Sequence, residues 1–435
     1  MPCRTIRYTQ ASDWPAINQW LAGRKGPEQT VEEPVIAILE AVKTRGDDAL
    51  AEYTSRFDAP GFSPADIAIT PEEIAHGCAQ VASRDKAIIQ EAADNIRSFH
   101  EHQQQKSWMV TQKNGTILGQ MVTAVDRAGL YVPGGQGGET PLISSLLMNA
   151  IPAQVAGVKD IVLVSPPRKD GSLNPSILAA ADILGIKRIF RVGSAWAIAA
   201  MAYGTATVPQ VDVIAGPGNI FVTTAKRLLV GEVGIDMIAG PSEIAILADE
   251  SATPQWLAAD LLSQAEHDTL ASSLLISPDT TLLEQTRQAL EQQLADLPRK
   301  DIATACLKDW SALIQVPDMD TGLELVNKIA PEHFELCVND PWSMLGKVRN
   351  AGAVFMGHHT PEPVGDYFAG PNHVLPTLST ARFSSPLSVD TFCKKTSILA
   401  ASDTYIQEHG AKIARLARME QLEAHARSME QRMQR

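Results

Sequence analysis

The spacing of hydrophobic residues changes along the chain, and each pattern predicts a different structure. Between about residues 28 and 105, apolar residues recur at helical spacing. Between about residues 129 and 378, short apolar runs alternate with helical segments, which predicts parallel sheets covered on both faces, with enough strands for two sheets. The predicted strands are 160–165, 188–192, 211–215, 244–248, 274–277, 312–316, 335–338 and 351–356, and helices 175–184, 220–229, 254–267, 282–294 and 321–329 lie between them.

The two ends of the chain follow other patterns. Residues 1–27 contain Trp14 and Trp20 and look like an arm that packs on another body, for which a second subunit is one candidate. Residues 390–402 look irregular or short-stranded, and residues 405–435 form a charged amphipathic helical tail. Such a tail is too polar to bury itself, and its composition suggests docking across an oligomer interface.

A long helix with a polar face is predicted at residues 85–102. Its histidines, His100 and His102, stand two apart and therefore point to different faces of the helix. We expect both side chains to be solvated and not to bind a metal together.

Length and charge limit the class of protein. A chain of 435 residues is too long for one hydrophobic core, so two or more domains are expected. Its 45% hydrophobic and 20% charged residues are typical of soluble globular proteins. The formal net charge of −13 argues against nucleic acid and against an anionic membrane as partners.

Cysteine usage and hydropathy indicate the compartment. The five cysteines are scattered and form no CxxC pair, which predicts free thiols in a reducing environment. The sequence has neither a stretch of signal-peptide type nor an uninterrupted apolar segment that could span a bilayer. We therefore expect a cytoplasmic protein.

One pair of residues has the chemistry of half a metal site. Gln264 and His267 stand three apart near the end of the predicted helix 254–267, so they project from the same face. An amide oxygen and an imidazole nitrogen side by side can bind a borderline metal ion, but two ligands alone do not hold one. Without further partners the pair would be an ordinary polar helix end. Asp366, in the irregular polar loop 364–377, is the natural oxygen ligand to join them.

Glycine-rich loops and an acid–base pair add to this chemistry. The loops 131–135, 216–219 and 239–243 adjoin predicted strands, where glycine lets the backbone approach an anion. None fits the G-x-G-x-x-G fingerprint, so they are also consistent with tight strand–helix turns. Glu332 and His333 lead into a predicted strand, and a carboxylate beside an imidazole suits proton transfer.

Six motifs occur together in one order: Gly216–Asn219, Ala239–Glu243, Gln264–His267, Pro331–His333, Gly365–Thr377 and the tail containing Glu420 and His425. In order and spacing they resemble the histidinol dehydrogenase family, from about Thr30 to the C-terminus. Glu420 and His425 are five apart, so on an unbroken helix they point in different directions and a joint role needs a bend.

The resemblance implies an α/β fold with two Rossmann-like domains, each an incomplete parallel sheet, an N-terminal helical segment and an extended helical C-terminal tail. It leads us to expect an N-terminal arm (1–27), a helical part contributing to the first α/β domain (28–128), a second Rossmann-like domain on the NAD side (129–238), the remainder of the first domain with the zinc and catalytic residues (239–381) and a tail exchanged between the subunits of a dimer (382–435).

The resemblance also implies the reaction. Members of this family are homodimers that use NAD and zinc, one ion per subunit, to oxidise L-histidinol through L-histidinal to L-histidine, the end of histidine biosynthesis. Matched by position, the zinc ligands are Gln264, His267, Asp366 and His425 of the partner subunit. His333 takes the hydroxyl proton and Glu332 activates the water that hydrates the aldehyde. The matched substrate contacts are Ser242, Gln264, His267, His333, Asp366, His373, Glu420 and His425, and the matched NAD contacts are Tyr131 and Asn219.

Two residues depart from the family pattern. The family often has Gln, an NAD contact, where this chain has Trp196, so the indole either stacks on the cofactor or the contact is lost. The family usually has Gly after the tail glutamate, where this chain has Gln421, which puts the local bend and the role of Glu420 in question. Two other functions stay open: a related dehydrogenase acting on another small alcohol, and a non-catalytic metal-dependent dimer or ligand-binding protein.

Overall fold

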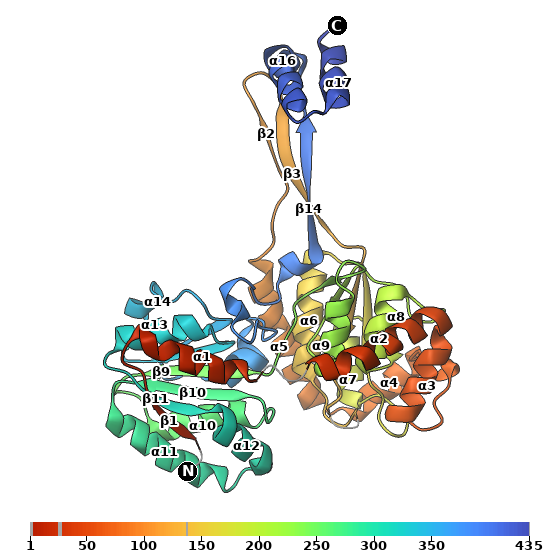
Figure 1. Ribbon diagram of the computed structural model, residues 1–435. Coiled ribbons are helices and arrows are strands. Elements are labelled where there is room, and N and C mark those ends of the chain that lie inside the picture. The colour runs from red at the N-terminus through yellow and green to blue at the C-terminus, as the bar shows by residue number, and fades with distance from the viewer. Residues whose placement is uncertain (1–2, 25–27, 136–137, 435) are drawn as a thin grey trace.

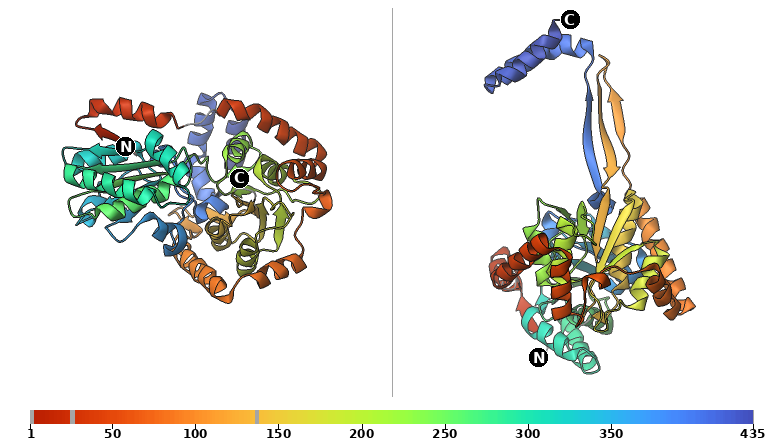
Figure 2. Two further views of the ribbon diagram at one scale, coloured as in Figure 1. Left: turned by 90° about the horizontal axis from the view of Figure 1, so that it is seen from below. Right: turned by 90° about the vertical axis from the view of Figure 1, so that its right-hand side faces the viewer.

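The computed structural model describes residues 3–24, 28–135 and 138–434. Two lobes lie side by side, and a long arm of strands and helices stands out from them (Figure 1). The right-hand view in Figure 2 shows the C-terminal helices well away from both lobes. No helix of the described residues is long and apolar enough to cross a membrane.

The first lobe is built on a parallel six-stranded sheet in the order β1-β11-β10-β9-β12-β13. Successive side chains of a strand point to opposite faces. Ile244 and Ile246 of β9 therefore pack with α10, α11 and α12, whereas Ala245 and Leu247 pack with α1 and α13. The strands are β1 (Arg4–Arg7), β9 (Glu243–Ala248), β10 (Ser272–Ser277), β11 (Ala312–Gln315), β12 (His333–Cys337) and β13 (Ala353–Met356). The helices are α1 (Trp14–Ala22), α10 (Pro254–Ala265), α11 (Thr280–Leu294), α12 (Lys300–Trp310), α13 (Met319–Ile329) and the short α14 (Trp342–Leu345) and α15 (Glu362–Val364).

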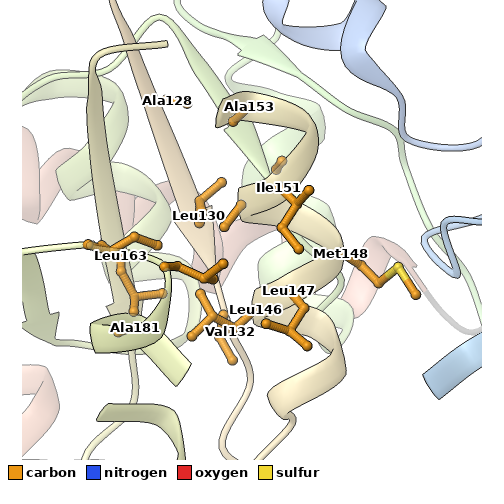
Figure 3. Close-up of a cluster of buried hydrophobic side chains, with 14 of the residues drawn as sticks. Ala128, Leu130, Val132, Leu146, Leu147, Met148, Ile151, Ala153, Leu163 and Ala181 are labelled. Carbon is orange, nitrogen blue, oxygen red and sulfur yellow. The ribbon is translucent and has the colours of Figure 1, made fainter. Parts of the chain in front are cut away.

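The second lobe has a parallel five-stranded sheet in the order β6-β5-β4-β7-β8. Leu130 and Leu163 pack with α5, α6 and α7 on one face (Figure 3), and Val162 and Val164 pack with α2, α3, α8 and α9 on the other. The strands are β4 (Arg127–Tyr131), β5 (Asp160–Ser165), β6 (Arg188–Arg191), β7 (Val213–Ala215) and β8 (Gly234–Ile235). The helices are α2 (Glu28–Arg45), α3 (Asp47–Phe57), α4 (Pro71–Gln80), α5 (Ser83–Glu101), α6 (Ile143–Ala156), α7 (Pro175–Ile183), α8 (Ser194–Tyr203) and α9 (Ile220–Leu228).

The arm is an antiparallel three-stranded ribbon that carries two helices. β3 (Ile117–Ala124) lies between β2 (Trp108–Thr111) and β14 (Cys393–Ala400), and its full length pairs with β14. α16 (Asp403–Met419) and α17 (Glu423–Met433) then fold back on each other. Two distant parts of the sequence therefore build one projecting element.

The predicted fold class is confirmed: all eight predicted strands occur within a few residues of their predicted bounds, in two parallel sheets. Two expectations about the N-terminal part of the chain are wrong. Helices α2–α5 pack on the five-stranded sheet and not on the sheet of residues 239–381. The N-terminal arm packs on its own chain, because β1 extends the six-stranded sheet beside β11. Residues 25–27, the predicted end of that arm, lie outside the described residues.

Segment 390–402 is also more regular than expected, since it contains the eight-residue strand β14. The expectation that His100 is solvated is wrong as well, because its side chain is fully buried. The imidazole lies 2.7 Å from the side-chain oxygen of Gln103 and 3.4 Å from the side-chain nitrogen of Asn372, which is distant in sequence. Helical periodicity cannot reveal such a tertiary contact.

Candidate active site

The acid–base pair Glu332–His333 lies at the amino end of β12. The preceding helix α13 ends at Ile329, and the left-handed conformation of the capping residue Ala330 (φ 50°) turns the chain toward the strand. Both side chains are buried, with 5% and 3% of their surface exposed. In open α/β sheets ligands usually bind at the carboxyl ends of the strands. Here the pair lies at the opposite edge of the sheet, beside the amino end of β9.

The peptide groups of Glu243, the first residue of β9, hold both members of the pair. The Glu243 N–H donates to a carboxylate oxygen of Glu332 at 2.9 Å. The Glu243 carbonyl oxygen lies 3.2 Å from Nδ1 of His333 and accepts a hydrogen bond from it. In the neutral imidazole this contact places the hydrogen on Nδ1, so that Nε2 of His333 carries the lone pair. Nε2 is buried without a hydrogen-bond partner and lies 3.6 Å from Asp366 and 3.8 Å from Glu362.

The electrostatics of the pair suit proton transfer. Burial raises the pKa of Glu332 to about 8. Burial alone would lower the pKa of His333, but the carboxylates of Glu362, Glu332 and Asp366 outweigh it and hold that pKa well above its usual value. Groups with strongly perturbed pKa values in a buried cluster are typical of catalytic sites.

The predicted metal ligands of the first lobe come together beside this pair. Gln264 is fully buried in the last turn of α10, and His267 lies exposed in the turn that follows. Asp366 lies in a single π-helical turn, Gly365–Ala369. Burial would raise the pKa of Asp366, but the contact with the His333 imidazole outweighs it and lowers that pKa. Partial desolvation of the imidazole lowers the pKa of His267 although the residue keeps an exposed surface, so a neutral imidazole and an ionised carboxylate are available.

Glu362 was missed by sequence reasoning. Its carboxylate is buried, and with His333 and Asp366 it forms a group whose potential ligand atoms all lie within 4.8 Å of one another. In the amide orientation that satisfies both partners, the Gln264 nitrogen donates to both Glu362 oxygens at 3.1 Å. The signal was its position four residues before Asp366, one helical turn away. No metal-ligand pattern flagged it, because its contact with Gln264 is tertiary.

The site lies where the two lobes meet. The side chain of Asn372, in the loop that follows Asp366, donates to the Met148 carbonyl of α6 at 2.6 Å. The next residue, His373, lies close enough to Asp366 for their charges to interact. Ser242 precedes β9 directly and is partly exposed. The predicted contacts Ser242 and His373 are thus near the acid–base pair.

Glu420 and His425 do not join this group within one chain. Glu420 caps α16 and His425 belongs to α17. These two helices pack against each other at the tip of the arm, away from both lobes (Figure 1). The bend that their spacing requires is present: α16 ends at Met419, and Gln421 adopts the left-handed conformation, with φ 63°. Gln421 therefore forms the bend that glycine was expected to provide.

The predicted NAD residues lie at the carboxyl edge of the five-stranded sheet, where dinucleotides bind in such sheets. Tyr131 ends β4, is buried, and its hydroxyl accepts a hydrogen bond from the Ser194 N–H at 3.3 Å. Asn219 follows β7 and caps α9. Gly216 between them has φ 127°, and an added Cβ would lie 2.1 Å from the Tyr131 carbonyl oxygen. Glycine is therefore required here by the close approach of the two backbone segments.

Trp196 points away from this edge, into the second lobe. Its indole stacks on Tyr53 and Phe57 with ring centroids 5.7 and 5.8 Å apart, and its N–H donates to the Thr54 hydroxyl at 3.2 Å. Both the face of the indole ring and its N–H therefore contact residues of α3. These contacts favour loss of the NAD contact over stacking on the cofactor.

The fold and the site define a class: a two-lobed α/β enzyme with a buried acid–base pair beside possible metal ligands on one sheet and nucleotide-type loops on the other. The sequence profile of the family described as histidinol dehydrogenase matches residues 22–433. The histidinol dehydrogenase of Oleidesulfovibrio alaskensis is 60% identical over 433 residues, covering 100% of both chains. That of Nitratidesulfovibrio vulgaris is 61% identical, covering 98% of both. The crystal structure of histidinol dehydrogenase from Elizabethkingia anophelis superimposes with a TM-score of 0.91 at 37% identity, covering 99% of this chain and 98% of that one.

The chain belongs to the histidinol dehydrogenase family. It is an NAD-dependent oxidoreductase of histidine biosynthesis, which oxidises L-histidinol through L-histidinal to L-histidine.

Proposed function

We propose that the oxidation takes place at the amino edge of the six-stranded sheet, with zinc held by Gln264, His267, Asp366 and His425 of the partner subunit. The donor set carries the proposal: an ionised carboxylate, a neutral imidazole, and an amide oxygen left for the metal because Glu362 takes the amide nitrogen. Nitrogen and oxygen ligands without cysteine suit zinc that must also accept substrate atoms. When bound, zinc supplies a template for the amine and imidazole nitrogens of the substrate.

His333 is the base for the first proton. Because its Nδ1–H is held by the Glu243 carbonyl, Nε2 is free to take the proton of the substrate hydroxyl. A cation beside Asp366 would offset part of the negative charge that raises the pKa of His333, which favours the neutral base.

Glu332 is the base for the second oxidation. Its carboxylate takes a proton from the water that adds to the aldehyde, and the hydrate then loses its one C–H hydride, the second of the overall reaction, to give the carboxylate product. Tyr131 and Asn219 would hold NAD, which would supply the hydride acceptor for both oxidations. Ser242 and His373 orient the substrate together with Glu420 of the partner subunit.

The exposed surfaces support a homodimer with shared sites. Beside the ligand Asp366, the side chains of Tyr367 and Phe368 are 61% and 38% exposed, and His267 is exposed as well. The arm likewise exposes large apolar side chains, among them Trp108, Met109, Leu399, Leu416 and Met419. Exposed apolar patches of this kind mark interaction surfaces. A partner's arm laid over the rim of the site would cover both and bring His425 to the metal.

Stoichiometry and chelation test the reaction. Purified protein with zinc should form two NADH for each L-histidinol, lose activity on chelation and recover it with zinc. His333→Ala should abolish turnover while the protein keeps its zinc. Turnover of another alcohol but not of L-histidinol would contradict the proposal, as would full activity of His333→Ala.

Subunit mixing tests the shared site. His425→Ala and His333→Ala homodimers should both be inactive, and mixed dimers should regain activity in one of two sites, where an intact body meets an intact arm. If each arm served its own chain, both sites of the mixed dimer would stay inactive. The matched control is His409→Ala, a tail histidine that packs on Tyr405 and should stay active.

A further inference from the structure

Arg24, at the end of the N-terminal segment, is the largest fully buried side chain of the first lobe, with 1% of its surface exposed. Every nitrogen of its guanidinium donates a hydrogen bond. Nη1 pairs with the carboxylate of Glu243, and Nε donates to the Leu270 carbonyl at 2.9 Å. Nη2 donates to the carbonyls of Pro241 and Ser242, both at 3.0 Å. One side chain thus holds three successive residues before and within the start of β9.

The same three residues organise the catalytic pair. Glu243 uses its side chain for Arg24, its N–H for Glu332 and its carbonyl for His333. Ser242 is a proposed substrate contact, and its carbonyl also accepts from Ser272 of β10 at 3.1 Å. A shift of segment 241–243 would therefore move the groups that position both bases and the substrate.

A role in stability alone would also explain why Arg24 and Glu243 are buried as an ion pair. The Glu243 carboxylate is 7% exposed, and its second oxygen has no hydrogen-bond partner in the described part of the chain. A buried carboxylate needs a cation, and removing the cation alone destabilises the fold. Burial of charge does not, however, require that the guanidinium also hold three backbone carbonyls. The fork geometry of arginine matches this multiple contact, and lysine cannot reproduce it.

We propose that Arg24 is a positioning residue for catalysis: by holding segment 241–243, it aligns Glu332 and His333 and fixes the tautomer of His333. The inference rests on the proposed roles of those two bases. It connects the N-terminal segment, which carries no reacting group, to the rate of the chemical steps. Misplacement of a catalytic group by about 1 Å costs on the order of 100-fold in rate.

The test compares Arg24→Lys, Arg24→Ala and the control Arg7→Ala, an exposed arginine of the same segment that bonds Gln315. Arg24→Lys should fold and bind zinc, with kcat reduced about 10- to 100-fold, because a single ammonium group cannot reproduce the four hydrogen bonds of the guanidinium. Its pH–rate profile should lose the limb of the first oxidation or move it, because His333 is no longer held at Nδ1. Arg7→Ala should match the wild type in both.

Chemical rescue separates positioning from stability. Ethylguanidinium added to Arg24→Ala should raise kcat several-fold without affecting Arg7→Ala. A folded Arg24→Lys variant with wild-type kcat and pH profile would overturn the inference, whether or not its melting temperature falls. If Arg24→Ala does not fold, Glu243→Gln replaces it in the test, because glutamine keeps the shape of the side chain and removes its charge. This variant should lose less kcat than Arg24→Lys. An unchanged kcat in both Glu243→Gln and Arg24→Lys would again overturn the inference. Full activity of His333→Ala would instead refute the proposed function, so the two failures are distinguishable.

Discussion

The substitution Glu362→Gln isolates the support of one proposed zinc ligand. The Gln264 nitrogen lies 3.1 Å from both oxygens of the Glu362 carboxylate, which keeps the amide oxygen turned the other way. An amide at position 362 offers one acceptor and one donor. The Gln264 amide can then turn over and give its oxygen to the new NH₂, presenting to the metal a nitrogen that cannot bind it.

The magnitude follows from these two hydrogen bonds. Hydrogen bonds to a buried charged group contribute about 1.5 to 3 kcal/mol. Loss of a partner that orients a metal ligand typically weakens metal affinity 10- to 100-fold, or about 1.4 to 2.7 kcal/mol. We therefore expect the Kd for zinc to rise by about that factor, with little change in melting temperature of the zinc-free protein, because the buried carboxylate is replaced by a neutral group of the same shape.

Competition with a fluorescent zinc chelator measures this Kd directly, and elemental analysis gives the zinc content after dialysis. Glu291→Gln is the matched control, since Glu291 lies on the exposed face of α11 and pairs only with Arg287 in the described contacts. A folded Glu362→Gln protein that binds zinc as tightly as the control would refute the orienting role of Glu362.

Three further substitutions test other features of the fold. Burial raises the pKa of Asp58 from 3.8 to about 6, so the folded state prefers the protonated carboxyl group. The stabilisation that results is complete below pH 4 and is lost as the pH rises through 6. Without NAD, Asp58→Asn should therefore raise the melting temperature by about 1 to 3 °C at pH 7.5 but not at pH 4.5, and an equal effect at both would contradict this cause. Trp196→Gln should lower KM for NAD, because it restores the glutamine that often contacts NAD in the family. It should also lower the melting temperature, because stacking on Tyr53 and Phe57 is lost. An unchanged KM would show that this position does not reach the cofactor. Gln421→Gly should keep full activity and change stability by less than about 1 kcal/mol, since the residue already has a left-handed backbone; loss of activity would indicate that the Gln421 side chain itself is needed.

Local sequence determined the elements of the two lobes. Apolar runs such as β5 and β9 are buried on both faces, so their hydrophobic residues are continuous and visible in sequence. The spacing of Gln264 and His267 likewise depends only on helix geometry, and the structure has both at the end of α10. The chemistry of Glu332 and His333 was suggested by adjacency, and their neighbour Asp366 by a polar loop.

Tertiary structure alone decided how these pieces meet. Helical periodicity in residues 28–128 shows an apolar face but not which sheet covers it, and α2–α5 cover the five-stranded one. The ribbon of β3 and β14 pairs segments about 270 residues apart, which no local pattern encodes. Burial of His100, the contact of Glu362 with Gln264 and the hold of Arg24 on Glu243 are of the same kind. Propensity and periodicity act over one or two turns of chain, whereas the orientation of a catalytic group depends on side chains that only packing brings into contact.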